Sequence, residues 1–222
     1  MQLTVLGSGS SGNCYLIHNE TECLILDAGI PSIDVQRALD YNIQNIVGVL
    51  VTHAHGDHAK YAKDFAKMGI PVIKPYEKPI DTITLGNFKI QPFGVEHDVP
   101  CFGFMVKHEE IGKLIYITDT THVVHKFSQL NHMLIEANYD KNLIDDTQAN
   151  ATHVRQGHME IGETIKFVKA NNCNSLRNVV LVHLSNANSN EQQFIDAIQK
   201  CVNCDVYAAD KGLQIRLSKY PF

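Results

Sequence analysis

The amino-acid sequence predicts an α/β protein, of the α+β type, that folds as one domain over residues 1–222. Short apolar stretches typical of strands alternate with amphipathic patterns typical of helices. Several of the strand-like stretches end in a His or an Asp. A chain of 222 residues is long enough to bury a substantial core without disulfides. The sequence shows no internal repeat, low-complexity tract or linker, which also favours one domain.

Apolar and β-branched residues predict the strands of the first half of the chain. Short strands are expected over 3–26, and a helix over 31–39. A further strand begins at Ile46, and a helix follows it up to Met68. The stretch 72–117 is expected to be rich in hairpins, because apolar and polar residues alternate there.

The second half predicts three helices and three strands. One face of the helix over 160–169 carries Ile161, Ile165 and Val168, and the helix over 189–199 begins at Ser189, with Gln192 at capping-box spacing. A buried strand ends at His183. The remaining expected elements are a helix over 138–149 and two final strands over 206–208 and 213–217.

The run from His53 to His58 places four metal-binding side chains within six residues, directly after an apolar strand. Ala54 and Gly56 are small enough to let the backbone turn tightly between them. Imidazole and carboxylate ligands without a thiolate suit zinc or manganese better than copper(I) or an iron–sulfur cluster. Structural zinc sites normally use several Cys ligands, so this run predicts a catalytic site.

Three downstream residues at strand ends can complete such a site: His97, Asp119 and His183. A single strand-end His is more often a hydrogen-bonded core residue than a ligand. Three such residues together with the His-rich run favour metal binding. One metal cannot use all four groups of so short a loop and still leave room for water, so we expect a second metal.

In this order, the residues resemble the ligand series of the metallo-β-lactamase-fold hydrolases, and the likeness spans Leu3 to Leu217. The resemblance implies a four-layer αβ/βα sandwich with the metals at the sheet edges. It also implies the following ligands: His53, His55 and His97 for the first metal, Asp57, His58 and His183 for the second, and Asp119 for both.

Differences between this chain and two branches of the family indicate which other branch it resembles more. True β-lactamases commonly have Cys where this chain has Asp119, and flavo-diiron enzymes have Glu where it has Ala54. The segment from His97 to Phe104 resembles the ribonuclease Z pattern of a His, a short gap, Gly and an aromatic residue. The nearest likeness is to the small bacterial YycJ/WalJ group, through the segments Ser8–Asn13, Leu134–Asn138, Gly157–His158 and His183–Ser185. Tyr139 and Met159–Glu160 differ from that group's usual His and Leu-Ser.

A mechanism follows from two cations that share Asp119. Lying roughly 3.5–4 Å apart, they would lower the pKa of a bridging water toward about 7 and so supply a hydroxide nucleophile for phosphodiester hydrolysis. We predict Asp57, Asp119 and His158 as catalytic residues, with His158 as the proton donor to the leaving group. Alternatively, His158 only caps the helix that follows, and the helix N-terminus would then favour its neutral form.

Asp27 ends another apolar strand before Gly29. It is expected either to support a metal-bound His or to form a turn. The loop from Gly7 to Asn13 lacks the Lys and the spacing of a P-loop, so tight turning beside the metals explains its glycines.

The charge and composition of the chain indicate which partners and which compartment to expect. The formal charge of -5 does not indicate a long polyanion partner, because affinity for nucleic acid comes chiefly from Lys and Arg contacts to phosphate. Lys60, Lys63 and Lys67 lie at helical spacing and either line an entrance or form a solvated face. The six Cys are scattered, no signal peptide precedes the first strand and no segment is long enough to cross a membrane, so we expect reduced thiols in the cytoplasm. The pair Cys201 and Cys204 is expected to be structural.

The resemblance to the YycJ/WalJ group implies a DNA or RNA nuclease of the 5′-exonuclease type. The alternative is a small-molecule phosphodiesterase that opens cyclic nucleotides, as phage anti-Pycsar enzymes of this fold do; the compact chain and its negative charge favour it. Thioester or lactone hydrolysis, or a metal-binding scaffold, forms a third class, against which His158 argues. Nucleic acid or a nucleotide is therefore the expected partner, two zinc ions are the expected cofactor with manganese as the alternative, and a homodimer is what the resemblance implies.

Overall fold

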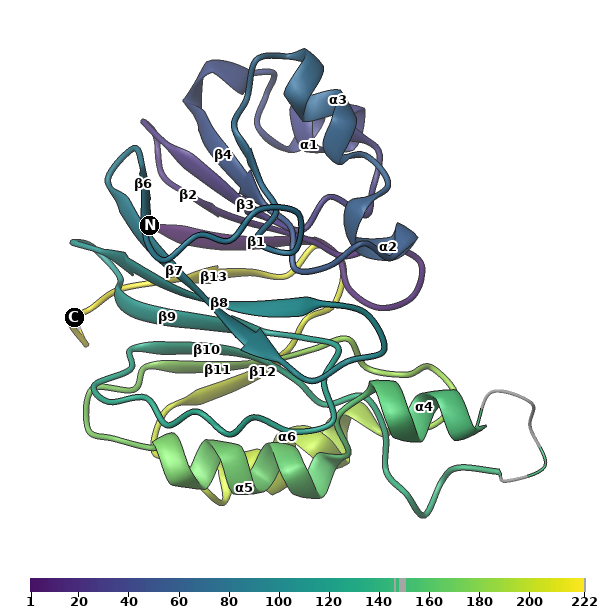
Figure 1. Ribbon diagram of the computed structural model, residues 1–222. Helices are drawn as coiled ribbons and strands as arrows, with labels where there is room; N and C mark the ends of the chain where they lie inside the picture. Colours follow the sequence, from purple (N-terminus) through teal and green to yellow (C-terminus); the bar gives the residue numbers. More distant parts are fainter. Residues whose placement is uncertain (146, 148–150, 222) are drawn as a thin grey trace.

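Two β-sheets pack face to face between two layers of helices (Figure 1). The computed structural model describes residues 1–145, 147 and 151–221. The first sheet has six strands in the order β13-β1-β2-β3-β4-β5. Its strands are β1 (Gln2–Gly7), β2 (Cys14–His18), β3 (Cys23–Leu26), β4 (Ile46–Leu50), β5 (Val72–Ile73) and β13 (Gln214–Arg216).

The second sheet has seven strands in the order β12-β11-β10-β9-β8-β7-β6. The pairs from β6 to β9 are antiparallel, whereas β9, β10, β11 and β12 run parallel. The strands are β6 (Ile83–Leu85), β7 (Phe88–Val95), β8 (Cys101–His108), β9 (Gly112–Ile117), β10 (His132–Glu136), β11 (Asn178–Val182) and β12 (Asp205–Ala208). The carboxyl ends of parallel strands meet at one edge, where ligand sites of such sheets commonly lie.

Helices cover the outer faces of the two sheets and also one edge of the sandwich, as Figure 1 shows. They are α1 (Ser32–Ala38), the 3₁₀ turn η1 (Ile43–Asn45), α2 (Gly56–Ala59), α3 (Ala62–Lys67), α4 (Ala151–Gly157), α5 (Ile161–Asn171) and α6 (Glu191–Gln199). Val35 of α1 and Phe65 of α3 pack on the first sheet, and Val168 of α5 and Phe194 of α6 pack on the second. A third apolar cluster, which includes Tyr15, lies between the sheets. These layers confirm the predicted four-layer sandwich.

Three helix predictions need correction. The helix expected after Ile46–Leu50 is two short helices, α2 and α3. Helix α6 begins one residue later than expected, because Asn190 rather than Ser189 is its N-cap and accepts a hydrogen bond from the main-chain N–H of Gln193 (3.1 Å). The Ser189 hydroxyl instead donates to the carbonyl of Ser185.

The helix expected over 138–149 is wrong for 138–145, which form an isolated bridge and turns. Main-chain N–H groups here bond to distant segments: that of Asn138 donates to Met159 (2.9 Å) and that of Asp140 to Asn188 (2.8 Å). These tertiary bonds replace the helical pattern that local propensity favours. Residues 146, 148 and 149 of the prediction lie outside the described residues.

None of the helices among the described residues is long and apolar enough to cross a membrane.

Candidate active site

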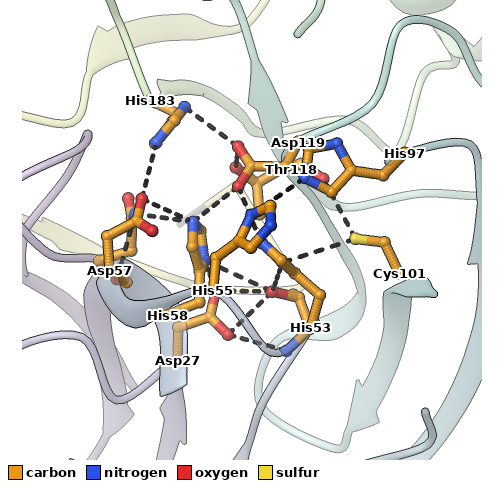
Figure 2. A network of polar contacts seen from close by, with 12 residues as sticks. Asp27, His53, His55, Asp57, His58, His97, Cys101, Thr118, Asp119 and His183 are labelled. Atoms are coloured by element: carbon orange, nitrogen blue, oxygen red, sulfur yellow. Dashed lines mark hydrogen bonds and ion pairs between the residues drawn. The ribbon is translucent and has the colours of Figure 1, made fainter. Parts of the chain in front are cut away.

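The predicted ligand residues converge at one edge of the sandwich, although they come from four separate segments of the chain (Figure 2). Ligand atoms of His53, His55 and His97 lie within 4.8 Å of one another. A second set with the same spacing consists of Asp57, His58, Asp119 and His183. The structure therefore brings all seven predicted ligands together, in the two groups that the sequence comparison implies.

Asp119 lies between the two sets. Its Oδ2 atom is 3.3 Å from Nε2 of His53 in the first set and 2.7 Å from Nε2 of His58 in the second. Its carboxylate is almost fully buried. This is the position that a carboxylate needs if it is to contact two cations at once.

The donor atoms fit divalent metal ions. Nε2 of His53 and Nε2 of His183 are buried without a hydrogen-bond partner among the described residues. Buried nitrogens that lack a partner normally cost free energy, so one such nitrogen in each set indicates that another group satisfies them. Two other ligand residues are anchored through Nδ1. Nδ1 of His97 lies 3.1 Å from the carbonyl of Gly157, and Nδ1 of His58 lies 2.8 Å from Asp27. Metal-binding His residues are commonly anchored in this way.

Comparison with known proteins agrees with this geometry. Residues 7–127 match the family described as the metallo-beta-lactamase superfamily. The chain belongs to this superfamily. The prediction of a metal-dependent hydrolase is thereby confirmed, and the donor set agrees with divalent metals as the cofactor.

Three similar proteins support the comparison made from the sequence. The chain is 29% identical over 172 residues to "Exodeoxyribonuclease YycJ" of Bacillus anthracis, covering 65% of each chain, just under two thirds of that protein's length. It is 24% identical over 222 residues to "Exodeoxyribonuclease WalJ" of Streptococcus pneumoniae serotype 2, covering 84% of this chain and 82% of that one. Human tRNase Z, short form, shares the fold with a TM-score of 0.65 at 17% identity, covering 98% of this chain and 99% of that one.

The loop that carries the first four candidate ligands is held against the segment after β3. The main-chain N–H of Ala28 donates to the carbonyl of His58 (2.7 Å), and that of Asn13 donates to the carbonyl of Asp57 (2.7 Å). A Cβ atom at Gly29 would overlap with the same carbonyl of Asp57, so only glycine allows this approach. The glycine that follows Asp27 in the sequence is thus needed for packing the metal loop.

Three site residues adopt left-handed backbone conformations within two residues of a strand end: Asp27 (φ 59°), Asp119 (φ 51°) and His183 (φ 57°). Such conformations cost about 1–3 kcal/mol for residues other than glycine and are found mostly at functional sites. The sharp turn at the end of each strand directs the side chain toward the site rather than along the sheet edge.

Asp27 supports His58, which is one of the two roles that the sequence left open. Its Oδ2 accepts hydrogen bonds from His58 Nδ1 (2.8 Å) and from the Tyr116 hydroxyl (2.5 Å). Its Oδ1 accepts from the main-chain N–H of Thr52 (2.8 Å). Because a carboxylate only accepts here, Nδ1 of His58 carries a proton and Nε2 is left to face Asp119.

Carboxylates control the protonation of the His residues in the absence of bound cations. Burial alone would lower the pKa of His183, but the charge of Asp119 outweighs it and raises that pKa to about 9. The pKa of His58 is also raised, because Asp119 and Asp27 outweigh its burial. His53 is different: burial and the neighbouring His58 lower its pKa to about 2. The protons on His58 and His183 occupy positions where a cation would satisfy the same carboxylates.

Glu136 is a site residue that the sequence analysis did not assign. It ends β10, it is fully buried, and its Oε1 atom lies 2.8 Å from His158 Nδ1 and 3.2 Å from His183 Nδ1. Its Oε2 accepts from the main-chain N–H of Thr120 (3.0 Å). The available signal was an acidic residue at the end of a strand parallel to those that end before Asp119 and His183.

His158 stands beside the shared carboxylate. Its Nδ1 is 3.4 Å from Asp119 Oδ1, and its side chain is 13% exposed. The alternative that it caps the next helix is wrong, because Glu160 is the N-cap of α5 and accepts from the N–H of Gly162 (2.8 Å). In the absence of bound cations, burial would lower the pKa of His158, but Glu136 and Asp119 together raise it to about 10.

Asp98 is a second neighbour that the sequence analysis did not assign. Its Oδ1 atom lies 3.0 Å from Nε2 of His97 and 3.5 Å from Nε2 of His55, and its side chain is 46% exposed. The carboxylate thus flanks the first set on its open side. Its position directly after His97 was the only signal in the sequence.

The remaining predictions concern thiols and lysines. All six Cys are free, in agreement with reduced thiols. Among the described residues, neither Cys201 nor Cys204 belongs to a group that could hold a metal ion. Lys60, Lys63 and Lys67 are exposed, and Lys67 pairs with Asp64 (3.6 Å), as expected for a solvated face.

Proposed function

We propose that this protein is a phosphodiesterase with two divalent metal ions, zinc with manganese as the alternative, and that it acts as a DNA or RNA nuclease of the 5′-exonuclease type. The observation that carries the proposal is the position of Asp119 between two sets of ligands, with His158 beside it. Two cations suit the two unesterified oxygens of a phosphodiester. An acid suits its poor leaving group, an alkoxide.

The protein's own residues have distinct roles in this proposal. His53, His55 and His97 would hold one cation, and Asp57, His58 and His183 the other, with Asp119 shared. When bound, the cations supply a hydroxide nucleophile at neutral pH and offset the charge that grows on the phosphate. Glu136 orients His158 through Nδ1, so the other ring nitrogen, Nε2, is free to donate a proton to the leaving oxygen.

The relatives favour a DNA substrate within this class. The relatives from Bacillus anthracis and Streptococcus pneumoniae are both named exodeoxyribonucleases, and the chain covers 82% of the length of the second. The residues proposed to act on the phosphodiester are the same whether the polymer is DNA or RNA, since none of them recognises a base or a 2′-hydroxyl.

The test compares substrate classes side by side. The purified protein is incubated with zinc or manganese and with 5′-phosphorylated linear DNA, RNA or a set of cyclic nucleotides, with Asp119→Ala as the blank. We expect mononucleotides to be released from polymer ends and this release to be lost in Asp119→Ala. If DNA and RNA both stay intact with zinc and with manganese, the nuclease proposal is contradicted.

One observation favours the alternative that the protein opens cyclic nucleotides. The cavity beside His158 is small, at about 340 Å³, and no Lys or Arg is among the residues that line it in the described part of the chain. A small substrate would need no long basic track. Opening of cyclic nucleotides with polymers left intact would favour this alternative and leave the metal site unchanged.

The role of His158 has a separate test. A p-nitrophenolate leaving group needs no proton, whereas a nucleoside alkoxide does. We therefore expect His158→Ala to lower release from DNA by about 10²–10⁴-fold and to lower turnover of bis(p-nitrophenyl) phosphate far less. Equal losses on both substrates would contradict the role as an acid.

A further inference from the structure

A second hollow in the surface lies far from the candidate metal site. It is formed where β11 and β12 begin and where β13 ends, and its volume is about 300 Å³. Asn178 is the first residue of β11, and the site residue His183 follows the other end of the same strand. At about 3.3 Å per residue, the strand keeps the two places roughly 17 Å apart. The hollow is therefore separate from the metal site.

Two arginines line this hollow, Arg177 and Arg216, and neither forms an ion pair with a described residue. The Nε atom of Arg177 is buried and has no hydrogen-bond partner in the part of the chain that the structure describes. Its Nη1 atom donates one long hydrogen bond, to the carbonyl of Asn174 (3.4 Å). Asp205 is the one carboxylate among the described lining residues, and it is exposed. Because a buried donor without a partner costs free energy, Arg177 is suited to a ligand that brings acceptor atoms.

Main-chain hydrogen bonds fix the two segments that carry the arginines. The N–H of Arg177 donates to the carbonyl of Asn131 (2.8 Å). The side-chain amide of the next residue, Asn178, donates to the carbonyl of Arg216 (3.2 Å) and so ties the two segments to each other. A ligand that binds here does not have to order the backbone first, which lowers the cost of binding.

The residues around the hollow indicate the chemistry of the ligand. Guanidinium groups recognise anions through paired hydrogen bonds, and a phosphate group offers three acceptor oxygens. Asn178 and Asn203 add amide groups, and Ser218 adds a hydroxyl group. The ring of Tyr220, which is 64% exposed, lines the same hollow and offers a face on which a base can stack. A volume of about 300 Å³ is at the lower end of the range of roughly 300–1,000 Å³ typical of small-molecule sites, which favours a single nucleotide over a polymer.

We propose that this hollow binds a nucleoside monophosphate, with Arg177 and Arg216 on the phosphate and Tyr220 against the base. The inference goes beyond the proposed function and does not rest on it, because such binding needs no turnover. A mononucleotide is also the product that an exonuclease releases, so the proposed enzyme would bind its own class of product here, away from the metals.

Calorimetric titration of the zinc-loaded protein with deoxyadenosine 5′-monophosphate measures the binding. Arg177→Gln and Arg216→Gln each remove one guanidinium, and we expect each to weaken binding by about tenfold or more. Arg37→Gln is the matched control, because Arg37 is exposed on α1 and pairs with Asp34 there; it should leave the affinity unchanged. Tyr220→Ala should weaken binding of the nucleotide and leave binding of inorganic phosphate unchanged.

The metals offer a second place for a phosphate, so the titration is repeated with Asp119→Ala. Binding that is lost in Asp119→Ala and unchanged in Arg177→Gln and Arg216→Gln would overturn the inference, and so would the absence of binding. Equal affinities for inorganic phosphate and for the nucleotide would overturn the nucleotide as the ligand. These results leave the proposed nuclease activity standing, because turnover of DNA and RNA tests that activity separately.

Thermal unfolding of each variant shows whether the change affects folding. Arg216 is exposed, so Arg216→Gln keeps the test valid even if Arg177→Gln fails to fold.

Discussion

Replacing Asp27 by Asn should separate the two metal sites. Among the described residues, Asp27 contacts the second set through His58 and makes no hydrogen bond to a ligand of the first set. The variant keeps the size of the side chain and removes one acceptor oxygen. We expect binding of the metal ion held by Asp57, His58 and His183 to weaken, and binding by the His53 set to change little.

The magnitude follows from the hydrogen bonds. Both carboxylate oxygens of Asp27 accept from donors: Oδ1 from Thr52, and Oδ2 from His58 and Tyr116. Either orientation of an Asn amide therefore sets its NH₂ group against a buried donor. Loss of such an anchor commonly costs 10–100-fold in metal affinity, or about 1.4–2.7 kcal/mol. The unsatisfied buried donor should also lower the free energy of unfolding by about 1–3 kcal/mol.

Metal content after dialysis against a graded series of chelator concentrations measures this effect directly. We expect Asp27→Asn to lose one metal ion per chain at chelator concentrations at which the wild-type protein keeps both. Asp34→Asn is the matched control, because Asp34 is an exposed carboxylate that pairs only with Arg37 on the surface (3.1 Å). Wild-type affinity for both metals in Asp27→Asn would refute the role assigned to Asp27.

Two further predictions concern protons. Burial lowers the pKa of His132 to about 3. The stabilisation that comes from the neutral ring is therefore complete above the unfolded pKa of about 6.5 and is lost as the pH falls toward 3. We expect the free energy of unfolding to fall by about 2 kcal/mol between pH 7.5 and pH 5. Urea unfolding of metal-free protein should show a loss that is about 2 kcal/mol larger in the wild type than in His132→Leu, since the other His residues, such as His53, titrate in both proteins. Equal pH dependence in the two proteins would contradict the prediction. Metal binding should release protons from His58 and His183, since their raised pKa values keep both protonated at neutral pH. Metal affinity should therefore fall as the pH falls. Calorimetric titration in buffers of different ionisation enthalpy measures the protons released, and release of none would count against the assignment.

Residues close together in the sequence made the metal-binding run predictable. His53 to His58 concentrate ligand types in one loop, and residues that end apolar strands must meet at a sheet edge. Local patterns also located most strands, because a buried strand leaves a run of apolar residues. They failed at 138–145, where hydrogen bonds to Met159 and Asn188 decide the backbone conformation.

By itself, the sequence determined the ligand types, their order along the chain and the layered α/β fold, because these depend on residue chemistry and on local periodicity. Only the tertiary structure decided the environment of each group. Glu136 lies within hydrogen-bonding distance of His158 and His183, and together with Asp119 it raises the pKa of His158 to about 10. The cavity beside His158 likewise forms where three distant segments pack together. Charge interactions and cavity walls depend on distances through space, which residues far apart in the chain acquire only on folding.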